Sequence, residues 1–163
     1  MIDLVSALTL LTAIGCGLIG GVFYAFSSFV MRGLARIPPA QGIAAMQSIN
    51  VTVLNPWFLI PFVGTAAASV LLAVISLLRW DEPGALWRLA GSALYFFGTF
   101  VVTRAFNVPL NDDLEAVDAT SEAGATRWAR YVPTWTAWNT LRTATAIGAA
   151  VCLIIALVAR RAA

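Results

Sequence analysis

The chain of 163 residues contains no histidine and no lysine, and only 11% of its residues are charged. Without histidine it lacks the usual haem ligand, the commonest zinc ligand and the commonest general base. Its two cysteines, Cys16 and Cys152, lie inside apolar runs, where a role as small core residues is favoured over a disulfide or a metal pair. We therefore expect no metal site. The net charge of +2 comes from ten arginines spread along the chain, so we expect no nucleic-acid partner.

The scarce charges leave long charge-free runs, of which residues 4–31 and 37–78 are the longest. A helix needs about 20 apolar residues to cross a bilayer, and only helices and closed barrels satisfy their backbone groups in hydrocarbon. Because the runs are continuous rather than alternating, they predict helices. The sequence therefore predicts an all-α, multi-pass integral membrane protein of the cell membrane. The first run has no basic residue before it and is too long for a signal peptide, so we expect it to remain as a span.

Four spans are predicted within a single domain covering residues 1–163. Their approximate ranges are 4–30, 56–78, 86–108 and 136–159. The short polar turn at 79–84 forces the second and third spans to be antiparallel. Four spans then place both termini on one side, which predicts an up-down four-helix bundle.

Short interfacial helices are expected in the first and third connections. In the first, Pro39 suits the start of a helix over about 40–53, whose Ile43, Met46 and Ile49 form one apolar face. In the third, Asn111 is predicted to be an N-cap, because carboxylates follow it in what would be the first turn. Gly124 is expected to end that helix. The alternative is that Asp112 and Asp113 are site carboxylates.

Small residues are concentrated in two of the predicted spans. Gly17 and Gly21 form a Gly-x-x-x-Gly pair with Gly20 beside them, and the fourth span has a further group at 144–150. Such residues let membrane helices approach closely. We expect them to pack within one chain, while an interface in a homo-oligomer remains an alternative.

Polar residues are predicted to converge at one end of the bundle, where the first and third spans end and the second and fourth begin. Few comparable residues are expected at the opposite end. The residues predicted to be catalytic are Arg104, Asn107, Asn139 and Arg142. The residues predicted to bind substrate are Tyr24, Asn50, Asn55, Trp135 and Trp138.

Helical spacing supports this grouping for the last two spans. Arg104 and Asn107 are three residues apart, and Trp135, Asn139 and Arg142 fall on one helical face. An arginine two turns inside a span is costly if it faces lipid, so Arg142 is expected to face the bundle or water. In the alternative interpretation, the arginines snorkel to lipid headgroups and the tryptophans form an interfacial belt.

Four segments resemble the DUF1772, or anthrone oxygenase-like, membrane proteins in order and spacing. They read GVFYAFSSFVMRGL, MQSINVTVLNPWF, FNVPLNDDL and YVPTWTAWNTLRT, and the resemblance extends over about residues 15–150. The most specific pieces are Asn-x-Pro-x-Asn at 107–111 and Trp-x-x-Trp-Asn-x-x-Arg at 135–142. Many relatives have histidine after the asparagine of the second piece, whereas this chain has Thr140. A mechanism based on that histidine is therefore not expected here.

The resemblance implies a four-span helical fold and, by analogy with fungal relatives, oxidation of an anthrone to an anthraquinone with O₂ and no cofactor. A flat apolar tricycle would partition from the bilayer into a pocket lined by aromatic rings. Its deprotonated form is electron-rich and would need fixed positive or donor groups at the oxyanion, for which the four predicted catalytic residues are suited. Asp112, Asp113 and Tyr24 are the candidate proton acceptors.

A second class of function remains open from the sequence. The same pocket would serve a non-enzymatic binding, carrier or accessory protein for a hydrophobic metabolite. Consumption of O₂ with an anthrone or hydroquinone distinguishes the two classes.

Overall fold

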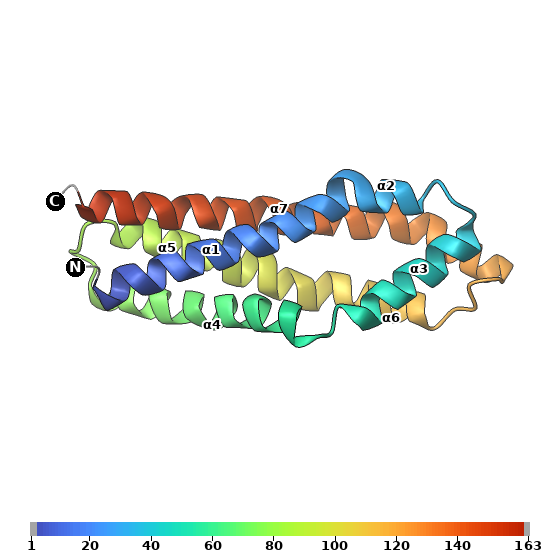
Figure 1. Ribbon diagram of the computed structural model, residues 1–163, viewed down its shortest axis with the longest axis horizontal. Helices are drawn as coiled ribbons and strands as arrows, with labels where there is room; N and C mark the ends of the chain where they lie inside the picture. The colour runs from blue at the N-terminus through green and yellow to red at the C-terminus, as the bar shows by residue number, and fades with distance from the viewer. Residues whose placement is uncertain (1–2, 162–163) are drawn as a thin grey trace.

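Four long apolar helices dominate the structure, a computed structural model that describes residues 3–161. Every regular element within that range is helical. The helices long and apolar enough to cross a membrane are Leu4–Leu34, Pro56–Leu78, Ala85–Glu115 and Glu122–Arg160. They run up and down, and both ends of the chain lie at the same end of the bundle (Figure 1). The predicted multi-pass protein and four-helix bundle are confirmed.

Two of the spans are built from several helical segments. The first contains α1 (Leu4–Ala25), the π-helical η1 (Phe26–Val30) and α2 (Met31–Leu34). The third contains α5 (Ala85–Ala93), the π-helical η2 (Leu94–Val101) and η3 (Thr103–Asn107), and α6 (Val108–Glu115). The second span is α4 (Pro56–Leu78), the fourth is α7 (Glu122–Arg161), and α3 (Pro39–Thr52) lies in the first connection.

The helix α1 begins at a side-chain cap. The carboxylate of Asp3 accepts a hydrogen bond from the backbone N–H of Ser6 at 3.0 Å. This bond lowers the pKa of Asp3 below its ordinary value, because it favours the charged form. The cap therefore stabilises the fold above that ordinary pKa, and the stabilisation is lost as the pH falls through the lowered value.

The predicted helix in the first connection is confirmed as α3. Ile43 and Met46 are fully buried, and Ile49 packs against the same cluster. The cluster also contains Leu114 of α6 and the aromatic residues Trp128, Tyr131 and Trp135 of α7. Because of this second core, the bundle continues beyond the start of α4, with α3 beside α6 at the end remote from the termini (Figure 1).

The predicted N-cap at Asn111 is wrong. Asn111 lies inside α6, which follows η3 without a break, and Gly124 lies in the first turn of α7 rather than at a helix end. The reason is the wide helical turn before Pro109. The Val108 N–H bonds to the Thr103 carbonyl, five residues back, and this π-helical geometry accommodates a proline that has no N–H to donate.

The predicted packing of Gly17 and Gly21 is also wrong. A side-chain carbon added at either residue would have nothing within 4 Å. Gly20, beside them, is the glycine that packs, because an added carbon there would lie 3.4 Å from the Cβ of Ala146. The small residues of α7 are buried as expected at Ala146 and Ala149.

Gly98 lies in close helix contact with Thr145. An added carbon at Gly98 would lie 2.5 Å from the Thr145 side chain, which is held by hydrogen bonds to Thr99 and Leu141. We expect Gly98→Ala to lower the free energy of unfolding by about 1–3 kcal/mol, because the crowded threonine must shift. Gly21→Ala is the matched control. Equal thermal unfolding of the two variants in detergent would contradict this packing.

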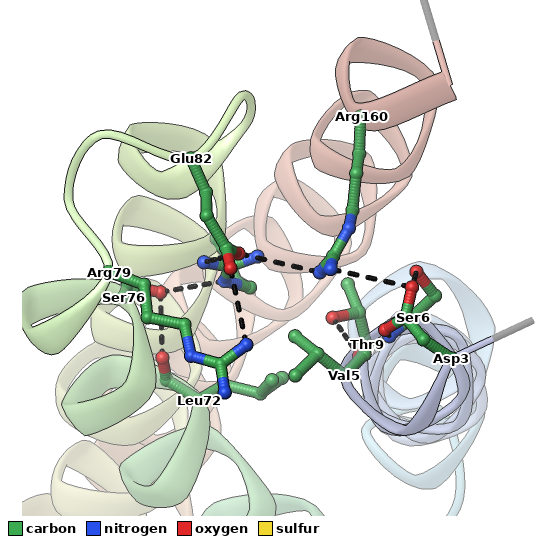
Figure 2. A network of polar contacts seen from close by, with 10 residues as sticks. Asp3, Val5, Ser6, Thr9, Leu72, Ser76, Arg79, Glu82 and Arg160 are labelled. Atoms are coloured by element: carbon green, nitrogen blue, oxygen red, sulfur yellow. Dashed lines mark hydrogen bonds and ion pairs between the residues drawn. The ribbon is translucent and has the colours of Figure 1, made fainter. Parts of the chain in front are cut away.

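A polar network closes the end of the bundle that holds the termini, where few polar residues were expected (Figure 2). Arg88 is only 2% exposed, and it donates to Ser76 at 2.9 Å and contacts Glu82 at 3.4 Å. Glu82 also contacts Arg79 and Arg160, at 3.2 Å and 3.5 Å. This burial could not be predicted from the sequence, because Arg88 follows a polar turn and has the position of a headgroup-facing arginine.

Candidate functional site

A cavity of about 570 Å³ lies at the end of the bundle opposite the network around Glu82. Its walls come from the end of the first span, from α3, from the start of α4, from the third span and from α7. Its apolar lining includes six aromatic residues: Phe23, Phe26, Phe58, Phe62, Phe100 and Trp135. The volume lies in the range typical of small-molecule sites, about 300–1,000 Å³.

Arg142 places a positive charge on the wall of this cavity. Its side chain is 3% exposed, and the guanidinium lies over the ring of Phe23 at 4.1 Å and that of Trp135 at 5.3 Å. Its Nη1 donates to the Thr103 hydroxyl at 3.1 Å and its Nη2 to the Asn139 amide oxygen at 2.7 Å. Within residues 3–161, no carboxylate forms an ion pair with it. Arg142 is therefore a fixed cation held by neutral partners.

Asn139 joins Arg142 to the first span. Its Nδ2 donates to the Phe23 carbonyl at 2.7 Å and to the Ser27 hydroxyl at 2.7 Å, next to the π-helical turn η1. It is fully buried but does not line the cavity. The neighbouring Thr140 pairs with Ser27 at 3.0 Å. Asn139 is thus placed to orient the guanidinium.

Three buried polar atoms of cavity-lining residues have no hydrogen-bond partner in the described part of the chain. They are the Nδ2 of Asn50, the Oδ1 of Asn107 and the Nε of Arg142. A buried polar atom without a partner is costly, so such atoms are usually paired with water or a ligand. Each of these atoms has almost no accessible surface, so a ligand in the cavity would reach it only after the surrounding side chains move.

Charged side chains lie along one side of the cavity. Arg104 is exposed and lines the cavity together with Asp112 and Glu115, so Arg104 and Arg142 face the same space. Asp113 points elsewhere, since it forms an ion pair with Arg127 at 2.6 Å. Of the two neighbouring aspartates, only Asp112 lines the cavity.

Like Asn139, three of the predicted substrate-binding residues lie outside the cavity. Tyr24 is 58% exposed, and Trp138 stacks on Phe106 with ring centroids 3.8 Å apart. Asn55 caps α4 by accepting from the Phe58 N–H at 3.2 Å. The other two predicted binding residues, Asn50 and Trp135, do line the cavity.

Sequence reasoning missed how Asn111 contributes to the site. Its Oδ1 accepts one bond from the Tyr131 hydroxyl at 2.9 Å and another from the Trp135 Nε1 at 2.8 Å. Asn111 therefore fixes the ring that lies against Arg142. The sequence feature that indicates this contribution is the four-residue spacing between Asn107 and Asn111, which puts both asparagines on one helical face.

We expect Asn111→Leu to lower the free energy of unfolding by about 2–5 kcal/mol, because each of two buried donors left unpaired costs about 1–3 kcal/mol. Asn111→Asp keeps an acceptor at the same place and is the matched control. Thermal unfolding of the purified variants measures the difference. A leucine variant as stable as the aspartate variant would show that the two bonds contribute little.

Comparison with known families gave one match. The family model described as anthrone oxygenase matches residues 57–152, a range that contains Asn107, Asn139 and Arg142. Searches of curated proteins and of solved structures gave no match.

Proposed function

Because the chain belongs to the anthrone oxygenase family, we propose that it is a membrane-embedded, cofactor-independent oxygenase that oxidises a flat aromatic substrate of the anthrone or hydroquinone type with O₂. The observation that carries this proposal is the buried Arg142, which faces an aromatic cavity and has no carboxylate partner within residues 3–161. We place the protein in the cell membrane.

The cavity suits a planar ligand that carries oxygen groups. Phenyl rings line its walls, and aromatic rings bind one another in offset-stacked or edge-to-face arrangements. The polar side chains of Asn50, Asn107 and Arg142, which line the cavity beside the rings, supply the polar contacts that the rings lack. A hydroxylated anthrone offers its single keto oxygen to these donors and a hydroxyl group to the amide oxygen of Asn107.

The role of Arg142 is to stabilise the anion of the substrate. Loss of a proton from the central methylene of an anthrone places negative charge on the oxygen across the ring. A fixed cation in a water-poor site stabilises such a charge more strongly than water does. Phe23, Trp135, Thr103 and Asn139 hold the guanidinium in place before the charge develops.

The reaction balances with O₂ as the only oxidant. The carbanion passes one electron to O₂, and the resulting radical and superoxide combine to form a C–O bond. Protonation gives a hydroperoxide on that carbon, and loss of its remaining hydrogen as a proton with cleavage of the O–O bond yields the ketone and water. One anthrone and one O₂ thus become one anthraquinone and one water. We assign Asp112, on the cavity rim, as the proton acceptor.

Oxygen uptake by purified protein tests the proposal. We expect the protein in detergent or liposomes to consume O₂ with 1,8-dihydroxyanthrone and to form the anthraquinone in equal amounts, faster than the autoxidation seen without protein. Tight binding of the anthrone with no O₂ uptake above that background would contradict the oxygenase proposal and favour a carrier. Membrane fractionation of the host cell tests the location.

A further inference from the structure

The boundary of the bilayer can be located from the exposed side chains. At the cavity end, the last exposed apolar residues of each span are Phe29, Trp57, Phe106 and Leu141. Trp57 is 91% exposed at the start of α4, a position typical of tryptophan at a membrane interface. Beyond these residues the exposed side chains include Arg32, Arg36, Asp112, Glu115, Arg127 and Arg130. The hydrocarbon boundary therefore passes at the level of the cavity.

The exposed residues that line the cavity are of two chemical kinds. Those between the end of α3 and the first turns of α4 are apolar, with Val51 at 63%, Leu54 at 68% and Val63 at 48% exposure. Val63 lies seven residues into α4, or about 10 Å deeper than its first residue, which places it at hydrocarbon depth. The third span contributes the charged residues Arg104, Asp112 and Glu115.

We propose that the cavity opens sideways into the bilayer through Val51, Leu54 and Val63, and that its ligand is a hydroxylated aromatic compound dissolved in the lipid. The chemical class of the ligand rests on the proposed function, whereas the opening rests on the rim itself. The rings pass between apolar side chains, and the ionisable oxygen then reaches Arg142. The charged residues of the third span keep their part of the rim in contact with water, so a proton released in the cavity has a route out.

Two physical reasons favour entry of the ligand from the bilayer over entry from water. An apolar tricycle partitions into hydrocarbon, since each Å² of apolar surface removed from water contributes about 25 cal/mol. Passage along Asp112 and Glu115 would bring that surface past charged groups that are costly to desolvate. The reaction that supplies the substrate must therefore release an apolar, membrane-soluble aromatic product.

Spin labelling tests the opening without reference to any reaction. Nitroxide labels are attached to cysteines introduced at Leu54, Val63 and Glu115 in protein reconstituted into liposomes, with Cys152→Ala as background. We expect labels at 54 and 63 to collide mainly with O₂, which concentrates in lipid, and the label at 115 to collide mainly with a water-soluble nickel chelate. Equal collision of the nickel chelate with all three positions would overturn the lateral opening.

A second experiment obstructs the opening. The double variant Val51→Trp and Leu54→Trp should lower kcat/KM for 1,8-dihydroxyanthrone in proteoliposomes by about tenfold, while thermal unfolding confirms that it is folded. Ile60→Trp is the matched control, because Ile60 is 70% exposed on α4 but does not line the cavity. Equal rates for the double variant and the control would overturn the route. If the wild-type protein consumes no O₂, the proposed function fails, and the spin labels still decide the opening.

Discussion

Replacing Arg142 with leucine is expected to lower turnover of 1,8-dihydroxyanthrone by about 10²–10³-fold, the loss that accompanies removal of a donor to a developing oxyanion. The guanidinium is the buried cation that faces the cavity, and its charge is not neutralised by a carboxylate within residues 3–161. Without it, the anion of the substrate would form in an apolar site with no opposite charge. Oxygen uptake at saturating substrate measures the effect.

Arg142→Leu should change the free energy of unfolding little. Leucine leaves the amide oxygen of Asn139 without its donor, which costs about 1–3 kcal/mol. It also removes a desolvated charge, and replacing buried charges by apolar residues is often neutral or stabilising by about 1–4 kcal/mol. Arg130→Leu, on the exposed surface of α7, is the matched control for both readouts. An Arg142→Leu variant that retains full turnover would contradict the assigned role, as would one that unfolds.

Removing Glu82 is expected to give the largest loss of stability at the opposite end of the bundle. Glu82→Gln leaves the 2%-exposed Arg88 without its counter-ion and weakens the contacts to Arg79 and Arg160. Breaking a buried pair typically costs about 3–5 kcal/mol, and we expect about 2–3 kcal/mol here because Glu82 itself is 28% exposed. Thermal or chemical unfolding in detergent measures the change.

Asp113→Asn is the matched control, since it also breaks an Arg–carboxylate ion pair. Asp113 and its partner Arg127 are 61% and 46% exposed, so the loss should be below about 1 kcal/mol. If the two substitutions destabilise the protein equally, burial of Arg88 does not determine the strength of the network around Glu82.

The fold could be predicted from the sequence because helices that cross hydrocarbon contain few charged residues, and this is visible in the composition. Charge-free runs marked the spans, and the polar turn at 79–84 marked the antiparallel pair. The ends of the helices were less predictable. Proline is typical of helix boundaries, yet η3 accommodates Pro109, and Pro133 lies inside α7. Backbone hydrogen bonds of π-helical turns leave no pattern in side-chain type.

The candidate site was predicted in part, and the misses have a common cause. Polar residues were favoured over apolar neighbours, so Tyr24 was chosen, whereas adjacent Phe23 supplies both a ring and a carbonyl to the site. One residue corresponds to a rotation of about 100° around a helix, which decides whether a side chain faces lipid or the cavity. Arg88 was overlooked for a related reason, because its partner Ser76 lies across a turn.

The most direct test of the central claim is the acidity of a ligand bound in the cavity. A hydroxyanthraquinone changes its visible absorption when its hydroxyl group ionises, so its pKa can be measured by titration in proteoliposomes. If Arg142 stabilises an oxyanion, the pKa of the bound hydroxyl should be lower in the wild-type protein than in Arg142→Leu by at least about 1 unit, equivalent to about 1.4 kcal/mol. Equal pKa values in the two proteins would contradict the claim.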